Sequence, residues 1–381
     1  MKTTILGAGP AGLYAAILLK RARPDMDVRV IEQNPAGATF GFGVVFSDQA
    51  LGFLREDDPD TAALIEPRMQ RWSDIVVNHA GERIAIDGIA FSGIGRLELL
   101  QLLQQRASAL GIRPTFDHRV TSVDELEPAD LVIGADGINS LLRAQAPSHY
   151  GESLEYLNNR FVWYGAEREF PALTQTFVDT PVGRMNAHHY RYAEGRSTFI
   201  IEMRPETFER SGFADMSEPA YRARCAEYFD SALQGAPLVA NNSVWRQFPI
   251  LKVAHWYRGH HVLVGDALHS AHFSIGSGTR LALEDVIALV KALRAHDWQV
   301  DAALPAYQAA RQPVVNKLTA AANASATWYE QFDENMELPP WEFALSYIRR
   351  AGRLDADRLR RLAPGFTREL ESRGISLELA A

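Results

Sequence analysis

The segment GAGPAG, from Gly7 to Gly12, has the glycine spacing of a loop that binds the pyrophosphate of a dinucleotide. The first glycine permits a tight turn, the second lets the backbone approach the phosphates, and the third lets a helix pack closely on a strand. The helix N-terminus would offer free N–H groups to the phosphates. Glu32 stands twenty positions after Gly12, where a carboxylate can accept hydrogen bonds from ribose hydroxyls. The predicted binding residues are Gly7, Gly9, Pro10, Ala11, Gly12, Glu32 and Gln33.

Two later segments make the same kind of strand-to-helix turn. DLVIGADGINSLLR (130–143) turns at Asp136 and Gly137, and VGDALHSAHFSIGSGTRLALED (264–285) turns at Gly265 and Asp266. An NAD site needs fewer such turns, whereas three of them could hold the pyrophosphate, the ribityl chain and the ring of FAD in sequence. We therefore predict that the bound dinucleotide is FAD.

The third segment also predicts how the flavin end is held. Asp266 would accept hydrogen bonds from the ribityl hydroxyls. The backbone of Gly276 and Gly278, together with the N-terminus of a helix at Thr279, would face the pyrimidine edge of the flavin ring, where negative charge accumulates on reduction.

The elements that must position these turns follow from the hydrophobic pattern. A strand at 3–6, a helix at 11–22 and a strand at 28–31 make a βαβ unit, which implies a parallel sheet. The aromatic and β-branched runs of 159–203, separated by turn residues, indicate an antiparallel sheet. Further buried strands and helices are predicted at 96–110, 129–136, 205–233, 260–267, 281–295 and 305–329.

The predicted fold is therefore α/β, with a Rossmann-like FAD-binding domain that resumes after an insertion. The FAD-binding domain takes 1–158 and 245–330, the inserted antiparallel β-sheet substrate domain takes 159–244, and a C-terminal helical tail takes 331–381.

Composition limits the class of protein. The 381 residues are 47% hydrophobic and carry a net charge of −8, which argues against a nucleic-acid partner. The single cysteine, Cys225, excludes an internal disulfide framework and is predicted to be a buried, inert thiol. No apolar run is long enough for a membrane helix. We expect a cytoplasmic monomer or homodimer.

The three motifs, in this order and with an antiparallel insertion between the last two, resemble the single-component FAD-dependent aromatic hydroxylases of the para-hydroxybenzoate hydroxylase type. The resemblance covers about residues 1–330 and implies that Arg96 reaches the FAD pyrophosphate. Two positions depart from the family: Phe273 stands where relatives usually have proline, and Arg280 where many have asparagine. The segment FGFGVVFSD (40–48) most resembles the salicyloyl-CoA 5-hydroxylase branch.

The resemblance implies a reaction as well as a fold. NADH, or otherwise NADPH, would reduce FAD, and O₂ would then form a flavin C4a-hydroperoxide that hydroxylates an activated aromatic ring. The branch implies salicyloyl-CoA as substrate and gentisyl-CoA as product. Anthraniloyl-CoA and an indole natural-product intermediate are alternatives within the enzyme class, and a non-catalytic dinucleotide-binding redox sensor is the alternative outside it.

Such a reaction needs a group that removes a phenol proton, and its pKa should lie near neutrality. The candidates are His188, Tyr190 and His272, and His188 and Tyr190 share one face of a strand by the two-residue period. An ordinary packed sheet surface is the alternative for each. A metal site is not predicted, because His269 and His272 lie in a loop without an H-E-x-x-H motif. The candidate substrate contacts are Phe42, Val44, Trp163 and Phe273.

Overall fold

The predicted βαβ unit forms one side of a five-stranded sheet in the computed structural model, which describes residues 1–47, 51–352 and 354–378. The strand order is β16-β17-β8-β1-β2, and all neighbours are parallel except β16 and β17. The inner strands are almost entirely buried because helices cover the sheet. The strands are β1 (Lys2–Leu6), β2 (Asp27–Ile31), β8 (Leu131–Gly134), β16 (Tyr257–Arg258) and β17 (His261–Leu263).

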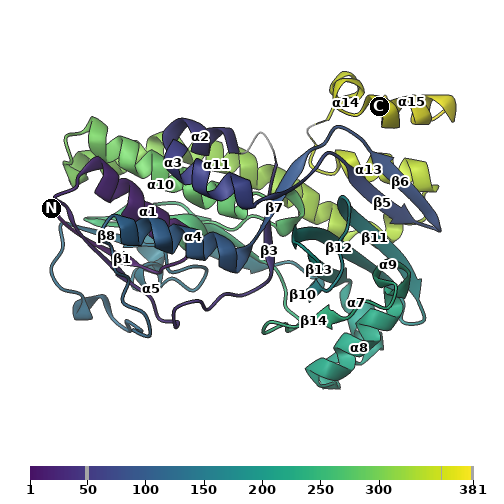
Figure 1. Cartoon of the computed structure of the whole chain (residues 1–381), viewed down its shortest axis with the longest axis horizontal. Helices are drawn as coiled ribbons and strands as arrows, with labels where there is room; N and C mark the ends of the chain where they lie inside the picture. The colour runs from purple at the N-terminus through teal and green to yellow at the C-terminus, as the bar shows by residue number, and fades with distance from the viewer. Residues whose placement is uncertain (48–50, 353, 379–381) are drawn as a thin grey trace.

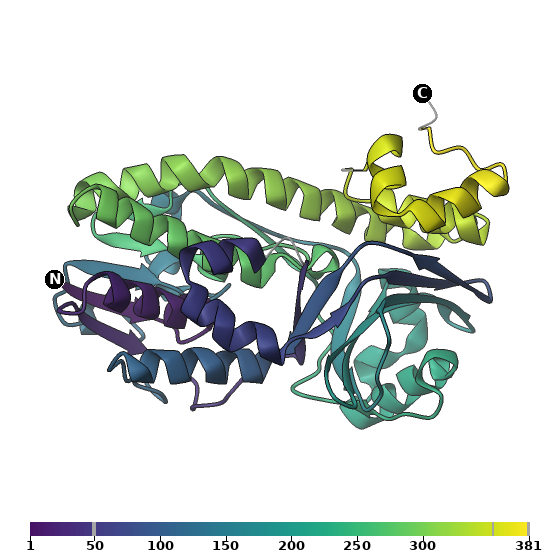
Figure 2. The ribbon, with the colours of Figure 1, turned by 45° about the horizontal axis from the view of Figure 1, so that its top comes forward.

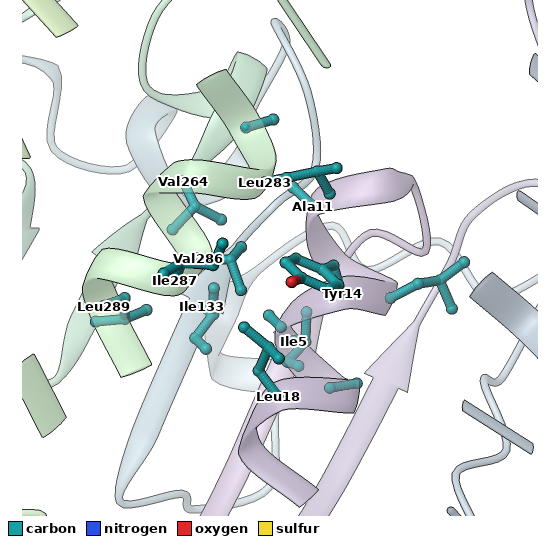
Figure 3. Close-up of a cluster of buried hydrophobic side chains, with 14 of the residues drawn as sticks. Ile5, Ala11, Tyr14, Leu18, Ile133, Val264, Leu283, Val286, Ile287 and Leu289 are labelled. Carbon is teal, nitrogen blue, oxygen red and sulfur yellow. The ribbon is translucent and has the colours of Figure 1, made fainter. Parts of the chain in front are cut away.

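Helices pack against this sheet and against one another. The helix α1 contacts both α4 and α10, and α10 contacts α11. Figure 3 shows the ring of Tyr14 on α1 facing Val286 on α10, with Ile5 and Ile133 on the strands beside them. All four side chains are fully buried. This core fixes the strand ends from which the predicted turns start. The helices are α1 (Pro10–Ala22), α4 (Arg96–Ala109), α10 (Gly278–Ala295) and α11 (Val300–Glu330).

A seven-stranded sheet forms the second lobe, to the right in Figure 1. Its strand order is β14-β10-β13-β12-β11-β5-β6. The helices α7 (Pro205–Ser211) and α8 (Glu218–Tyr228) follow β13 in the chain, as predicted. The strands are β5 (Ile75–His79), β6 (Glu82–Ile86), β10 (Arg160–Ala166), β11 (Leu173–Thr180), β12 (Gly183–Ala193), β13 (Arg196–Met203) and β14 (Leu238–Val239).

The hairpin β5–β6 is a correction to the predicted domain boundary. The sequence assigns residues 75–86 to the cofactor domain, but β5 pairs in parallel with β11 of the second sheet, which is therefore not wholly antiparallel. The physical reason lies at the other end of the chain. The buried side chains of this hairpin pack against the C-terminal tail, so the hairpin joins the sheet that the tail covers.

The C-terminal tail is helical, as predicted. Its helices α13 (Pro340–Arg349) and α15 (Pro364–Ser372) contact β6. Figure 2 shows α11 running along the top of the molecule from the cofactor lobe to these helices. One helix thus connects the two lobes. Within the described ranges, no helix is both long and apolar enough to cross a membrane.

A small sheet joins the two lobes. Its strand order is β3-β7-β4, and Figure 1 shows β3 and β7 between the larger sheets. The N-terminal residue of β3 is Gly43, and the next residue after β7 is Arg96, the first residue of α4. The strands are β3 (Gly43–Ser47), β4 (Gln70–Trp72) and β7 (Phe91–Gly95).

Candidate active site

A cavity of about 420 Å³ opens between the two lobes. Most of the predicted cofactor residues line one part of its wall: Gly9, Pro10, Ala11, Arg96, Gly137, Asp266, Gly276, Gly278 and Thr279. Aromatic and apolar side chains of the second lobe and the loops beside it line the other part: Phe161, Trp163, His188, Tyr190, Ile200, Phe248 and Phe273.

The glycine loop has the geometry that its spacing predicts. Gly7 has φ +97°, and a Cβ there would lie 2.3 Å from the carbonyl oxygen of Ala135. A Cβ on Gly12 would lie 1.9 Å from the carbonyl oxygen of Gly7. A Cβ on Gly9 would instead have no heavy atom within 4 Å, and Gly9 lines the cavity. The loop therefore leaves open space where a pyrophosphate would approach the backbone.

Glu32 supports the glycine loop directly. Its Oε2 accepts a hydrogen bond from the Ala8 N–H at 2.8 Å, and its Oε1 accepts from the backbone N–H and the side chain of Asn34 at 2.9 and 2.7 Å. A carboxylate has further lone pairs, so these bonds are compatible with a ribose hydroxyl as an additional donor. Gln33 is exposed and does not line the cavity.

The second turn presents an acceptor that lacks a donor. Asp136 Oδ2 accepts from the Leu141 N–H at 2.7 Å, but its buried Oδ1 has no partner among the residues that the structure describes. Burial raises the pKa of this carboxyl. Arg96 is its counterpart on α4: its guanidinium lines the cavity and makes no hydrogen bond or ion pair within the described parts of the chain. A free cation there suits a pyrophosphate.

A buried network holds the third turn. Asp285 is fully buried on α10 and accepts hydrogen bonds from the Gly265 N–H at 3.1 Å and from Arg311 Nε at 2.8 Å. Its Oδ2 also lies 2.7 Å from His269 Nε2. Burial alone would raise the pKa of Asp285, but His269 and Arg311 outweigh it and lower the pKa. This network fixes Gly265, which has φ +61°, and so places Asp266 in the cavity wall.

The glycine-rich loop completes the cofactor part of the wall. Gly276 has φ +61°, and a Cβ there would lie 2.7 Å from Val45 Cγ1. The helix α10 begins at Gly278, one residue before the predicted start at Thr279, and directs its N-terminus at the cavity. The open Gly9, the guanidinium of Arg96 and the Oδ1 of Asp136, both without partners among the described residues, and this helix end together fit a long dinucleotide that carries a ring at one end.

Comparisons with known proteins agree with this geometry. A family described as "FAD binding domain" matches residues 128–322, and one described as "NAD(P)-binding Rossmann-like domain" matches residues 5–41. A salicyloyl-CoA 5-hydroxylase of Streptomyces sp is 37% identical over 361 residues, which is 92% of this chain and 70% of the relative. The chain belongs to the FAD-dependent aromatic-ring monooxygenases.

Other relatives place the chain in the same enzyme family. A 3-hydroxy-4-methyl-anthranilyl-[aryl-carrier protein] 5-monooxygenase of Streptosporangium sibiricum is 34% identical, covering 88% of this chain and 90% of the relative. A protodeoxyviolaceinate monooxygenase of Chromobacterium violaceum is 33% identical, covering 91% and 94%. The fold matches that of 2-methyl-3-hydroxypyridine-5-carboxylic acid oxygenase at 20% identity, with a TM-score of 0.72 over 94% of this chain and 97% of that one.

These findings confirm the predicted fold class, FAD as cofactor and NAD(P)H as electron donor. The sequence left open whether this protein is an enzyme or a non-catalytic redox sensor. Because the relatives are named monooxygenases, the protein is an enzyme.

The aromatic end of the cavity contains most of the predicted substrate contacts. Val44, Trp163 and Phe273 line the wall. Phe42 does not: its ring packs on Gly165, where a Cβ would lie 2.7 Å from Phe42 Cδ1, and Phe40 lines the wall instead. Gly41, with φ +79°, breaks the two-residue alternation that would otherwise place these two rings on one face.

Of the predicted catalytic residues, His188 has the polar atoms most available for a hydrogen bond with a substrate. It lines the cavity, its side chain is buried, and neither ring nitrogen has a hydrogen-bond partner within the described residues. Burial, and secondly the charge of Arg350, lower its pKa to about 3. The imidazole is therefore neutral, with one acceptor and one donor unused.

The other two predicted catalytic residues are engaged elsewhere. The Tyr190 hydroxyl donates to the Gly43 carbonyl oxygen at 3.0 Å, and burial raises its pKa. His272 does not line the cavity: it lies behind Phe273, with ring centroids 4.2 Å apart, and its Nδ1 is 2.8 Å from Ser274 Oγ. Burial, then the charges of His188 and Arg350, lower the pKa of His272 to about 3.

The two departures from the family pattern differ in position. Phe273 lies in the aromatic end, with its ring centroid 5.2 Å from Phe161 and 6.0 Å from Phe248. Arg280 pairs with Glu284 at 2.7 Å along α10 and does not line the cavity. Among the described residues, no group of histidine, cysteine and carboxylate side chains could hold a metal ion.

Sequence reasoning missed the mouth of the cavity. Phe40 is 51% exposed and Val244 is 48% exposed, and both line the wall. Asn241 joins their two loops, because its Nδ2 donates to the carbonyl oxygens of Thr39 and Gly41 at 3.0 and 3.1 Å.

The mouth also carries a cation. Arg246 lines the cavity opposite Phe161 in a short antiparallel bridge, so both side chains lie on the same face. Its guanidinium turns outward, donates to the Asn242 carbonyl oxygen at 3.2 Å and has no carboxylate partner in the part of the chain that the structure describes. In NNSVWRQF (241–248), Asn242, Val244, Arg246 and Phe248 line the cavity at a spacing of two residues. This spacing was the signal in the sequence for this part of the wall.

Proposed function

We propose that this monooxygenase hydroxylates an aromatic ring carried as a thioester, with salicyloyl-CoA as substrate and 5-hydroxylation to gentisyl-CoA as the reaction. The observation that carries the proposal is that the two ends of the cavity are lined by different kinds of side chain. Its aromatic end holds the neutral His188, whose ring nitrogens have no partner among the described residues, and its open mouth holds apolar side chains and Arg246, which has no carboxylate partner there. The relative named salicyloyl-CoA 5-hydroxylase supports the choice of acyl group.

The aromatic end suits a planar ring. Phe161, Trp163 and Phe273 supply aromatic surface around it, and they also exclude water, which protects an activated oxygen from loss. FAD held along the glycine turns would take electrons from NADH or NADPH and would use them to activate O₂, one atom of which goes to the ring and the other to water. NADH is the expected donor.

His188 is the proposed partner of the phenol hydroxyl. Because it is neutral before the substrate binds, one of its nitrogens can accept the phenol proton in a hydrogen bond. A phenolate formed beside it would raise the low pKa again through the attraction between the two charges. A ring carbon para to that oxygen becomes more electron-rich, which is what electrophilic hydroxylation requires.

Tyr190 and His272 have proposed roles in positioning. The bond from Tyr190 to the Gly43 carbonyl oxygen holds the start of β3, which carries Val44 and follows the loop that carries Phe40. His272 supports the ring of Phe273 from behind. Neither hydroxyl nor imidazole needs to exchange a proton with the substrate for these roles.

The mouth suits the arm of a thioester better than a free carboxylate. A free acid would end inside the cavity and would need a buried cation there, whereas Arg246 is exposed and turned outward. A phosphopantetheine arm presents apolar methyl groups and amides to Phe40, Val244 and Asn242, and ends in a phosphate that an arginine can bind.

The experiment that tests this proposal measures NADH oxidation and hydroxylated product with salicyloyl-CoA, salicyloyl-pantetheine, free salicylate, anthraniloyl-CoA and a tryptophan-derived indole. We expect salicyloyl-CoA to give the highest kcat/KM, and the pantetheine thioester to react with a higher KM. Strong product formation from free salicylate with none from either thioester would contradict the proposal.

A variant of the mouth tests the role of the arm. Arg246→Glu should raise KM for salicyloyl-CoA about five- to tenfold, as expected for reversing an exposed charge near a phosphate, and should leave KM for the pantetheine thioester unchanged. Arg83→Glu, on the exposed side of β6 and outside the cavity wall, is the matched control.

A further inference from the structure

The segment that follows α13 reaches, from the C-terminal tail, the turn directly behind the cavity wall. Arg350, the first residue after α13, donates from NH2 to the Ser274 carbonyl oxygen and from NH1 to the Tyr347 carbonyl oxygen, both at 2.8 Å. Its guanidinium lies 4.0 Å from the centroid of the Tyr347 ring. No carboxylate pairs with it in residues 1–47, 51–352 and 354–378, so its charge is uncompensated.

Ser274 is the point where this arginine meets the substrate pocket. The Ser274 Oγ lies 2.8 Å from His272 Nδ1 and 2.8 Å from Ser325 Oγ of α11. Ser274 also follows Phe273 directly, and Phe273 lines the aromatic end. Three parts of the chain thus hold one short turn: its own histidine, α11 and the tail.

We propose that Arg350 is a positioning residue for ring hydroxylation: it clamps the turn at 273–275 so that Phe273 closes the aromatic end, and it places a fixed positive charge beside His188 and His272. A guanidinium suits this task because its planar fork can bind two carbonyl oxygens at once while it stacks on a ring. The proposal rests on the family reaction and holds for whichever aromatic ring the enzyme accepts.

The surroundings of His188 contain few competing charges. On its own strand lies Tyr190, and His272 approaches from the turn. The helices α11 and α13 contribute Tyr329 and Tyr347, whose pKa values are raised by burial.

From β13, on the same side of the sheet, comes Glu202, whose pKa burial raises to about 8, so that it is largely neutral at pH 7. Glu330 on α11 is bound to Asn158 and Asn159. Arg350 is therefore the fixed charge that acts on His188: after burial, it is the second cause of the low pKa.

A pair of adjacent arginines allows a matched test. Arg349 also donates to a carbonyl oxygen, that of Leu377 at the end of the tail, but it does not contact the turn. We compare Arg350→Gln, Arg350→Lys and Arg349→Gln, using whichever substrate of the panel stimulates NADH oxidation. The readouts are product formed per NADH oxidised, the pH profile of kcat/KM, and the pH dependence of thermal unfolding without FAD.

Arg350→Gln should lower kcat/KM about tenfold, as expected for loss of a charge-assisted hydrogen bond, and should lower product per NADH as the aromatic end admits water. It should also move the acid limb of the pH profile to higher pH, because the histidine pKa values rise toward their usual value. The acid onset of unfolding should move to lower pH, because the folded and unfolded pKa values then differ less. Arg350→Lys should restore the pH behaviour but not the coupling, because it keeps the charge and loses the fork.

Arg349→Gln should match the unchanged enzyme in coupling and pH profile, even if it unfolds at a lower temperature. Equal coupling and equal pH profiles for Arg350→Gln and Arg349→Gln would overturn the proposal, since both arginines would then serve only to pack the tail. If Arg350→Gln does not fold, normal coupling in Arg350→Lys would overturn the clamp. Failure of every thioester in the panel would instead overturn the proposed substrate alone.

Discussion

Replacing Asp285 by asparagine should destabilise the enzyme and loosen its cofactor together. The side chain is fully buried and receives hydrogen bonds from Gly265 and Arg311, with His269 at 2.7 Å. An asparagine of the same shape loses the charge and turns an NH₂ group toward at least one of these donors. Removing one partner of a buried ion pair costs about 3–5 kcal/mol, because the other charge stays buried.

The melting temperature converts this free energy into an observable. Unfolding entropy of about 2.1 cal/mol/K per residue gives roughly 0.8 kcal/mol/K for this chain, so Tm should fall by about 4–6 °C. The assay is thermal unfolding of the protein without FAD, followed by titration with FAD. We expect weaker FAD binding as well, because Asp285 holds the Gly265 turn that places Asp266 in the wall.

Glu284→Gln is the matched control. Glu284 is the neighbouring carboxylate and also pairs with Arg311, at 2.9 Å, but its side chain is 13% exposed and Asp285 remains to hold the arginine. Its loss of stability should be about 1 kcal/mol. A Tm of Asp285→Asn within about 1 °C of the unchanged enzyme, with normal FAD affinity, would refute this account of the network.

Three further predictions follow from the site. Gly9→Ala should leave the apoprotein's Tm unchanged but lower FAD affinity at least about tenfold, because its Cβ occupies open space that the pyrophosphate needs; normal affinity would be inconsistent with the assigned phosphate site. Tyr190→Phe should retain most of kcat and lose about 1–2 kcal/mol of stability, since its hydroxyl holds the Gly43 carbonyl oxygen; loss of activity in a stable protein would indicate a proton relay. Acidification should destabilise the protein: His188 and His272 keep pKa values of about 3 when folded but about 6.5 when unfolded, so the unfolded state binds more protons and stability falls as the pH drops below 6.5, by up to about 1.4 kcal/mol per pH unit for each histidine. Urea unfolding at pH 7 and pH 5.5 measures this fall, and His188→Asn should reduce it; an unchanged slope would contradict the buried, neutral state.

The cofactor part of the site could be predicted from the sequence because its geometry is local. Gly7 and Gly12 must be glycine for steric reasons that act within a few residues, and each Asp-Gly or Gly-Asp turn follows an apolar strand directly. The sequence also contains a local signal for the position of Arg280. Glu284 stands four residues after it, which is the spacing of an ion pair on a helix. This ion pair explains why Arg280 does not line the cavity.

The substrate part depends on contacts between distant segments, and these the sequence could not supply. Arg350 and Ser274 are separated by 76 positions. The hairpin β5–β6 joins the second sheet only because the C-terminal tail covers it. Gly41, with a positive φ, changes the chain direction so that Phe40 lines the cavity wall instead of Phe42.

The measurement that tests the central claim most directly follows the oxygen atom. The purified enzyme, with FAD, NADH and salicyloyl-CoA, is incubated under O₂ labelled with oxygen-18, and the thioester product is analysed by mass spectrometry. The account predicts one labelled oxygen on the ring, at the carbon para to the existing hydroxyl, with NADH oxidised in proportion to product. NADH oxidation that yields only hydrogen peroxide, or a hydroxylated product without label, would contradict it.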